Sequence, residues 1–465
     1  MRIELAKNCR DLAALRTFLG VGSTEDAQGM LAGIATDSRE VLPGDLFVAL
    51  PGKRQNGAVF IEDAFRAGAA AVLTEEKTRA DDARVLFVPS VTFALLRAAG
   101  EYRRRYGKTV VAVTGSTGKT TAKEGISALL REKGSVQYSR GNFNSNIGMP
   151  LSLLSFEVSD FWVSEIGVSH TGEMREPARA AMPDLAVLTN VGTAHIGNYG
   201  NFAALQAEKA EITAHLSPVG AALVPAEVPN AVLGCPAEKI FHFGSASADF
   251  FAEKIVNGEK GVTLDFTAQN RYERKICGLS FPIAGKIGVS ALEILASVGV
   301  LLGLTDDEIM RGVAAAGKKT PRFRVLEAGD KLLFDDTYNA SPESVAGALE
   351  SFAHRAGDRV RVAVLGDMLE LGAYSEALHD ALGEAAARSG VSLLVSYGKF
   401  AAFTARGAAR GGIPASNIHI FGKDERERLK ESLPCLLPAD AAVLFKGSGA
   451  MRMNEFLLVV KEGTI

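Results

Sequence analysis

The chain has little excess charge, few cysteines and no long apolar run. Its 465 residues carry a formal net charge of −3, so nothing in the composition points to a nucleic-acid-binding surface. The nearest approach to a membrane span, residues 294–304, is too short to cross a bilayer. The N-terminal segment lacks the apolar core of a signal peptide. We therefore expect a cytoplasmic protein with no membrane span.

Cysteine is scarce and scattered. The four cysteines form no CxxC pair and have no metal-ligand spacing; they are Cys9, Cys235, Cys277 and Cys435. This usage indicates a reducing compartment, with unpaired cysteines that mostly serve packing. The apolar content of 47% is ordinary for globular proteins, and the length predicts about three domains at roughly 150 residues each.

A glycine-rich loop between a strand and a helix is the most informative stretch of the chain. Residues 110–114 predict a buried strand and residues 121–133 a helix, with Gly-Ser-Thr-Gly-Lys-Thr-Thr at 115–121 between them. Glycines let backbone N–H groups turn toward phosphate oxygens, and a helix N-terminus favours anions. We predict a phosphate-binding loop in which Lys119 contacts the terminal phosphates and Thr120 binds Mg²⁺. A plain glycine-rich turn is the weaker alternative.

Polar side chains follow two further strands. Glu165 ends a strand predicted at 161–167, where ligands of open α/β sheets collect, so it is placed for Mg²⁺. An edge-of-strand solvent carboxylate is the alternative. His195 follows the next strand, and by itself such a histidine is more often a structural hydrogen-bonder than a ligand. Lys209, on a predicted helix, is on its own chemistry a surface lysine.

The ends of the chain also follow an α/β pattern. In the last third, strands alternate with helices and predict a parallel sheet; the strands are 331–336, 361–366, 392–396 and 442–446. Three polar segments that end such strands could be turns, but together they favour a site; they are 336–342, 366–372 and 446–449.

Near the N-terminus, Asp37-Ser38-Arg39 is a polar turn or a ligand contact, and the sequence alone does not decide.

Two segments indicate where domains meet. Arg103-Arg104-Arg105 closes a helix predicted at 94–106, and we expect this cluster to be a solvated helix end. Residues 317–321 predict a linker. The domain boundaries predicted from these segments are 1–106, 107–318 and 319–465.

With these motifs in place, nearly the whole chain resembles the Mur ligases of peptidoglycan synthesis. The loop TGSTGKTT and the segments at 335–342 and 366–372 are similar to the branch that adds D-alanyl-D-alanine, although Ser341 replaces an asparagine of its pattern. The Asp-Asn-Pro-Arg motif of the diaminopimelate-adding branch is absent. Residues 37–39 and 43–52 resemble the family's UDP-binding domain.

The resemblance implies a fold and a reaction. The fold is α/β with three domains: a small α/β UDP-binding N-terminal domain, a central P-loop ATPase domain with a mostly parallel sheet, and a Rossmann-like C-terminal domain. The reaction is an ATP-dependent amide-bond ligation through an acyl phosphate, giving ADP and phosphate. It implies UDP-MurNAc-tripeptide and D-Ala-D-Ala as small-molecule substrates, and we expect a monomer.

The resemblance also assigns roles to residues. The implied catalytic residues are Lys119, His195, Lys209 and Arg322. The implied Mg²⁺ ligands are Thr120, Glu165, His195 and Lys209, the last as a carbamate formed with CO₂. A carbamate suits a metal site because it offers oxygen where an ammonium would repel the ion. Implied ATP contacts are Gly115, Ser116, Thr117, Gly118, Lys119, Thr120, Thr121, Asn142, Asn190, Arg322, Asp336 and Asn339. Implied UDP-substrate contacts are Asp37, Ser38 and Arg39. Because Arg322 belongs to the third domain, closure should assemble the site.

One segment departs from the family. Where the family has Gly-Lys-His-Asn-x-x-Asn-Ala on the adenine side, this chain has apolar or small residues at Ile287, Gly288 and Ala291. Each lost base hydrogen bond is worth about 0.5–1.5 kcal/mol, so we expect a relaxed nucleotide preference.

Other functions stay open at this point. One is a Mur-type ligase that adds a single amino acid. Another is a folylpolyglutamate synthase-like enzyme, against which the segment at 37–39 argues. A third is a non-catalytic nucleotide- or UDP-sugar-binding regulator, favoured only by the altered adenine segment.

Overall fold

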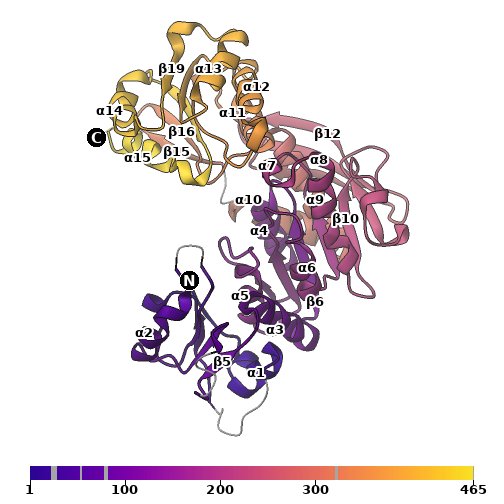
Figure 1. The fold of residues 1–465 in the computed structure, drawn as a ribbon. Helices are drawn as coiled ribbons and strands as arrows, with labels where there is room; N and C mark the ends of the chain where they lie inside the picture. The colour runs from indigo at the N-terminus through magenta and orange to yellow at the C-terminus, as the bar shows by residue number, and fades with distance from the viewer. Residues whose placement is uncertain (22–28, 53–54, 78–81, 320–322, 464–465) are drawn as a thin grey trace.

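The computed structural model describes the chain except for residues 22–28, 53–54, 78–81, 320–322 and 464–465. Three α/β domains, each built on its own sheet, follow one another along an elongated molecule (Figure 1). The three-domain α/β fold predicted from the sequence is therefore confirmed.

The N-terminal domain has a five-stranded sheet in the order β1-β2-β3-β4-β5, parallel except for β1. Its strands are β1 (Arg2–Glu4), β2 (Gly33–Ala35), β3 (Leu46–Val48), β4 (Ala71–Thr74) and β5 (Val85–Phe87). Its helices are α1 (Leu12–Leu19), α2 (Ile61–Arg66) and α3 (Val91–Tyr106). Helix α3 packs against α5 and α6 of the central domain and so joins the two domains.

The central domain has a nine-stranded sheet in the order β14-β13-β12-β11-β10-β9-β6-β8-β7. It is parallel from β7 to β12, and β12, β13 and β14 run antiparallel. Its strands are β6 (Thr109–Thr114), β7 (Val136–Tyr138), β8 (Phe161–Glu165), β9 (Leu185–Leu188), β10 (Ala221–Pro225), β11 (Ile240–Phe243), β12 (Phe250–Gly258), β13 (Gly261–Ala268) and β14 (Arg274–Phe281). Its helices are α4 (Lys119–Leu130), α5 (Gly148–Leu154), α6 (Arg175–Ala181), α7 (Ile196–Tyr199), α8 (Phe202–Ala210), α9 (Gly285–Leu301) and α10 (Asp306–Lys319). Strand β6 lies inside this sheet, and residues 110–113 are fully buried, which explains its unbroken apolar run.

The C-terminal domain has a six-stranded sheet in the order β15-β16-β20-β17-β18-β19, parallel except for the β15–β16 hairpin. Its strands are β15 (Arg324–Ala328), β16 (Lys331–Asp336), β17 (Val360–Gly366), β18 (Leu393–Tyr397), β19 (Ile418–Phe421) and β20 (Ala441–Lys446). Its helices are α11 (Pro342–Arg355), α12 (Ser375–Arg388), α13 (Ala401–Arg410), α14 (Arg426–Leu436) and α15 (Asn454–Glu462). Helix α11 packs against α9, so the C-terminal domain docks on the central one.

Three local predictions are wrong in part. Arg104 and Arg105 are exposed, as predicted, but Arg103 is buried and binds Asp184 at 2.8 Å and the carbonyl of Ala181 at 3.1 Å, because these groups lie under the end of α3. Of the linker predicted at 317–321, residues 317–319 instead belong to α10, and 320–321 lie outside the described residues. The cysteines are unpaired, as predicted, but Cys277 and Cys435 are exposed and so do not serve packing.

Two general predictions concern membrane spans and domain boundaries. In the described part of the chain, no helix combines the length and apolarity that a membrane crossing needs. The predicted domain boundaries stay a prediction, although α3 ends at Tyr106.

A buried carboxyl group on α9 should make stability depend on pH. Glu293 is 5% exposed, accepts a hydrogen bond from the Ala252 N–H at 3.0 Å, and has its pKa raised by desolvation from 4.5 to about 7. The folded state then holds a proton that the unfolded state has lost, so stability falls as pH rises between these values. We expect Glu293→Gln to be about 2–3 kcal/mol more stable than the wild type near pH 8, with the gap closing toward pH 5. Urea denaturation at both pH values measures this, and a gap independent of pH would contradict it.

Candidate active site

The loop between β6 and α4 has the backbone that phosphate binding requires. Gly115 and Gly118 both have positive φ, 146° and 76°, which glycine adopts without strain. A Cβ on Gly115 would lie 2.0 Å from Thr189 Oγ1, so no larger residue fits there. Helix α4 begins at Lys119, directly after the second glycine, and its N-terminus faces the loop.

Neighbouring side chains hold this loop in shape. The Lys119 ammonium donates to the loop carbonyls of Gly115 at 2.8 Å and Ser116 at 3.2 Å. The Asn190 Oδ1 accepts from the Thr117 N–H at 2.9 Å, and Thr189 Oγ1 donates to the Thr117 carbonyl at 2.6 Å. Asn190, predicted as an ATP contact, therefore supports the loop itself.

Glu165 lies beside the helix end of the loop, at the carboxyl end of β8. It is 2% exposed, and the Thr120 hydroxyl donates to its Oε2 at 3.2 Å. The structure thus brings together two of the predicted Mg²⁺ ligands. Asn144 Nδ2 donates to the other carboxylate oxygen at 2.7 Å, and the buried Lys123 ammonium lies 3.8 Å from Oε2.

Sequence reasoning missed Asn144 and Lys123. The asparagine-rich loop at 141–148 was the available signal for the first, although the prediction named Asn142, which is exposed. Lys123 lies one helical turn beyond Lys119, and its ammonium also donates to the Gly141 carbonyl at 3.1 Å. A lysine on a helix gives no local sign that it is buried.

These donors fit a magnesium–nucleotide complex better than an all-protein metal cage. Among the described residues, no group of three or more His, Cys, Asp or Glu side chains could hold a metal ion. Thr120 and Glu165 supply hydroxyl and carboxylate oxygens, which Mg²⁺ prefers, and phosphates and water commonly supply the rest.

Lys209, on α8, is not a surface lysine. It is 1% exposed, and its pKa is lowered to about 7, mainly by desolvation and next by the charge of Lys119. Its neighbour Glu208 accepts from the N–H groups of Gly172 at 2.6 Å and Met174 at 2.7 Å. A large share of Lys209 is therefore an uncharged amine at neutral pH. Lys119 lies close enough for its positive charge to disfavour the protonated form of Lys209.

His195 lies after β9 and reaches the C-terminal domain. Its Nδ1 contacts Glu370 Oε2, from the loop after β17. Desolvation lowers the pKa of His195, the contact with Glu370 opposes this, and the charges of Lys119 and Lys209 lower it further. His195 therefore belongs to the same electrostatic cluster as the P-loop.

The three polar segments predicted for the C-terminal domain do meet at one edge of its sheet. Lys446 binds the Asp336 carboxylate and donates to the Asn339 carbonyl at 3.0 Å. The Gly449 N–H donates to Asn339 Oδ1 at 3.4 Å, and the Leu369 N–H donates to Ser448 Oγ at 2.9 Å.

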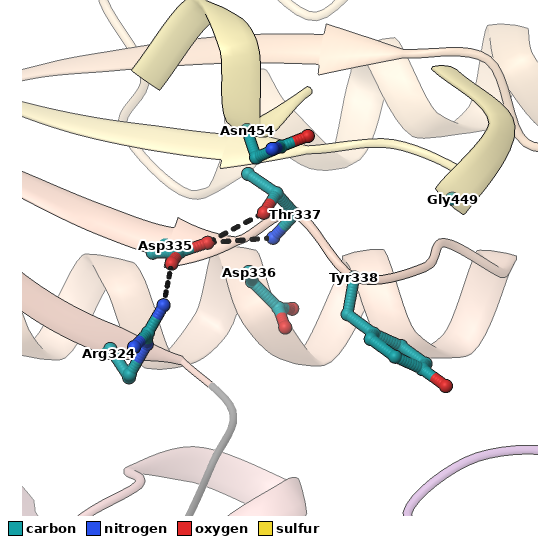
Figure 2. Close-up of a pocket in the computed structure, with 7 residues that line it drawn as sticks. All are labelled: Arg324, Asp335, Asp336, Thr337, Tyr338, Gly449 and Asn454. Carbon is teal, nitrogen blue, oxygen red and sulfur yellow. Dashed lines mark hydrogen bonds and ion pairs between the residues drawn. The ribbon is translucent and has the colours of Figure 1, made fainter. Parts of the chain in front are cut away.

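A cavity of about 340 Å³ opens beside this edge (Figure 2). Arg324 donates to Asp335 at 2.6 Å, and Asp335 accepts from Thr337 (Figure 2). The neighbouring Asp336 carboxylate is paired with Lys446. The lining residues are Arg324, Asp335, Asp336, Thr337, Tyr338, Gly449 and Asn454. Arg322, the predicted γ-phosphate contact, lies outside the described residues.

Two residues of the segment predicted to bind UDP, Asp37 and Arg39, form an ion pair with each other. Asp37 accepts from the Arg39 Nε at 2.9 Å and from its N–H at 3.1 Å, and this ion pair holds the pKa of Asp37 well below its usual range. The Arg39 side chain is 86% exposed and so faces solvent.

Comparison with known proteins gives the chain a family. Three family models match it: "Mur ligase family, catalytic domain" over residues 31–102, "Mur ligase middle domain" over 113–301, and "Mur ligase, glutamate ligase domain" over 321–449. This chain belongs to the Mur ligase family.

Individual Mur ligases match over almost the full length. The UDP-N-acetylmuramoyl-tripeptide--D-alanyl-D-alanine ligase of Escherichia coli is 33% identical over 95% of this chain and 96% of its own. Its Bacillus subtilis counterpart is 30% identical over 92% and 93%. MurF from Acinetobacter baumannii superposes with a TM-score of 0.83 at 27% identity, covering 97% of this chain and 98% of its own. MurF from Thermotoga maritima in complex with ADP has a TM-score of 0.78 at 30% identity, over 93% and 97%. The family predicted from the sequence is confirmed.

In this Mur ligase, the residues that depart from the family's adenine segment serve packing. Ile287 lies against Gly347 of α11, where a Cβ on that glycine would be 2.5 Å from the isoleucine side chain. A Cβ on Gly288 would lie 1.8 Å from the Ile283 carbonyl oxygen, so the start of α9 accepts only glycine there. Ala291 is 8% exposed. Ile287 thus lies at the contact between the central and C-terminal domains, whereas Gly288 packs within the central domain.

Proposed function

We propose that this Mur ligase joins D-alanyl-D-alanine to a UDP-N-acetylmuramoyl-tripeptide and uses ATP to do so. The observation that carries the proposal is the match to ligases of that name over more than nine-tenths of both chains. The phosphate-binding loop supports ATP as the co-substrate, and so does the ADP complex of a related MurF.

Catalysis of this reaction requires mainly the stabilisation of negative charge on the phosphates. ATP phosphorylates the free carboxylate of the peptide, and the dipeptide amine displaces phosphate from the acyl phosphate. Bound Mg²⁺, held by Thr120 and Glu165, would neutralise phosphate charge. The loop N–H groups and Lys119 would orient the transferring phosphoryl group and stabilise its charge.

We further propose that Lys209 carries a carbamate. The uncharged ε-amine attacks CO₂: the N–C bond forms as one C=O π bond breaks and its electron pair moves to oxygen, and the nitrogen then loses one proton to water. The lowered pKa and the burial of Lys209 favour the amine that this step needs. The carbamate oxygen and His195 would then serve a second Mg²⁺ ion.

The remaining sequence assignments are proposed in the same way. Asp37, Ser38 and Arg39 would contact the UDP portion of the substrate, and Arg322 the γ-phosphate. Further proposed ATP contacts are Gly115, Ser116, Thr117, Gly118, Thr121, Asn142, Asn190, Asp336 and Asn339. We propose that the enzyme acts in the cytoplasm as a monomer, with domain boundaries at 106/107 and 318/319.

Phosphate release tests the proposed function. Purified protein with ATP and Mg²⁺ should release phosphate only when UDP-MurNAc-tripeptide and D-Ala-D-Ala are both present. Release with a UDP-dipeptide and a single amino acid would indicate another branch of the family. Nucleotide binding without release under either condition would indicate a regulator.

The packing of Ile287 and Gly288 predicts a relaxed choice of nucleotide. Neither residue has a side-chain group that could hydrogen-bond to a base, whereas the P-loop and Glu165 would act on phosphate and metal alone. Losing one or two base contacts should reduce discrimination by roughly tenfold, so GTP should support measurable turnover. The ratio of kcat/KM for ATP and GTP measures this. A strong ATP preference would mean that other groups read the base.

A further inference from the structure

Two non-glycine residues with left-handed backbones face each other across the boundary between the central and C-terminal domains. His195 has φ of 64° and directly precedes α7, whereas Glu370 has φ of 63° in the loop after β17. Such conformations are uncommon outside glycine and persist where the surroundings enforce them. Their pairing marks this contact as one that the fold holds under strain.

The contact is made by side chain and backbone together. Glu370 Oε2 meets Nδ1 of the His195 ring, and the Glu370 carbonyl accepts from the Gly197 N–H at 3.2 Å. Gly197 itself lies against Gly372, where a Cβ would be 2.5 Å from the Gly372 nitrogen. The backbones of the two loops therefore fit closely, while the Glu370 side chain itself is 52% exposed and is placed by its contact with the ring.

Further hydrogen bonds hold the two loops that form this contact. In the C-terminal domain, buried His379 accepts from the Met368 N–H at 2.9 Å and Ser448 accepts from the Leu369 N–H at 2.9 Å, so the residues before Glu370 are held. In the central domain, Thr193 donates from its N–H at 2.6 Å and from its hydroxyl at 2.8 Å to Glu343 of α11. Two carboxylates of the C-terminal domain, Glu343 and Glu370, thus bind the loop that carries His195.

We propose that Glu370 is a positioning residue that fixes the tautomer and orientation of His195, so that docking of the C-terminal domain completes the metal site of the central domain. The carboxylate accepts Nδ1–H, which leaves the Nε2 lone pair for a metal ion beside Lys209. A histidine ligand with a carboxylate behind it is a common outer-shell arrangement, and here the carboxylate comes from a different domain. The inference rests on the proposed function for the presence of the metal.

The tautomer of His195 is measured directly by NMR of protein labelled with ¹⁵N-histidine, with His195→Gln used for assignment. At a pH where the ring is neutral, the wild type should show Nδ1–H. In Glu370→Ala the ring should return to Nε2–H, the form that an unconstrained imidazole prefers. Glu370→Gln keeps an acceptor oxygen and should keep Nδ1–H. Tyr374→Phe is the matched control: it removes a hydrogen bond to the Gly200 carbonyl, 3.3 Å long, in the same interface, and should leave the tautomer unchanged.

Metal affinity is the second readout. Binding of Mn²⁺ in the presence of ADP and bicarbonate, followed by electron paramagnetic resonance, should weaken about tenfold or more in Glu370→Ala. It should stay within roughly threefold of the wild type in Glu370→Gln and Tyr374→Phe. An Nε2–H ring in the wild type, or unchanged Mn²⁺ binding in Glu370→Ala, would overturn the inference.

Two further outcomes also decide. Equal loss of Mn²⁺ binding in Glu370→Gln and Glu370→Ala, with Nδ1–H kept in the glutamine variant, would assign the effect to charge rather than orientation and overturn the inference. An equal loss of Mn²⁺ binding in Tyr374→Phe would show that Glu370 is only one of several docking contacts, and would also overturn the inference. The proposed function fails separately, because it falls only if the wild type does not join D-Ala-D-Ala to the UDP-linked tripeptide.

Discussion

Replacing Lys209 with methionine should produce a protein that is more stable than the wild type and almost inactive. Folding lowers the pKa of this lysine from 10.5 to about 7, because the side chain is buried. Between these values the unfolded state holds a proton that the folded state has released, so stability rises with pH across the window. Near pH 7 the cost of burying the amine is still present, and methionine of similar length removes it.

The expected gain is about 3–5 kcal/mol near pH 7 in metal-free buffer without CO₂, as the size of the pKa shift implies. It should shrink toward pH 10, where the unfolded lysine also loses its proton. Urea denaturation at both pH values measures the gain. A methionine variant that is no more stable at either pH would show that Lys209 is not held uncharged.

Loss of activity at the same position tests the carbamate. Lys209→Ala should lose roughly 10²–10³ in kcat/KM, in line with the loss of one electrostatic group from a buried site. Short carboxylic acids should restore part of the activity by placing an oxygen ligand in the space that the side chain leaves. Arginine should not restore it, because it cannot form a carbamate. Near-wild-type activity in the alanine variant would end the catalytic assignment.

Replacing Glu165 with glutamine should be nearly as damaging, although the two side chains have the same shape. The carboxylate accepts from Thr120 and Asn144 on its two oxygens, and glutamine has only one oxygen to offer. It also loses the charge that would hold Mg²⁺. We expect kcat/KM for ATP to fall by roughly 10²–10³ and the Mg²⁺ concentration for half-maximal rate to rise.

Glu124→Gln is the matched control for this experiment. Glu124 is the other carboxylate near Lys123, at 3.2 Å, but it is partly exposed and makes no predicted contact with the nucleotide. Its substitution should change kcat/KM by less than about threefold, as for a surface ion pair. If both variants behaved alike, the effect would belong to Lys123 rather than to Mg²⁺.

The fold and the phosphate-binding loop could be predicted because their signals are local. Gly115 and Gly118 act through their own backbone angles, and the apolar run of β6 reports its own burial. Glu165 was found for the same reason, since the end of a strand is visible in the sequence. Spacing and residue type were sufficient wherever the chain interacts with its immediate neighbours.

The remaining features depend on what packs against them. The chemistry of Lys209 alone suggested a surface residue, and only the resemblance to Mur ligases indicated otherwise; its burial comes from segments distant in sequence. Arg103 was misplaced because its partner Asp184 lies 81 positions away. Glu370 could be placed within a polar segment but not opposite His195, because that contact joins two domains.

Mass spectrometry of the product shows directly whether a dipeptide is joined to a UDP-linked tripeptide. Purified protein is incubated with ATP, Mg²⁺, UDP-MurNAc-tripeptide and D-Ala-D-Ala. We expect the UDP-linked species to gain the mass of one D-Ala-D-Ala less one water, with one ADP formed per product. An unchanged tripeptide species, or addition of a single amino acid to a UDP-linked dipeptide instead, would contradict it.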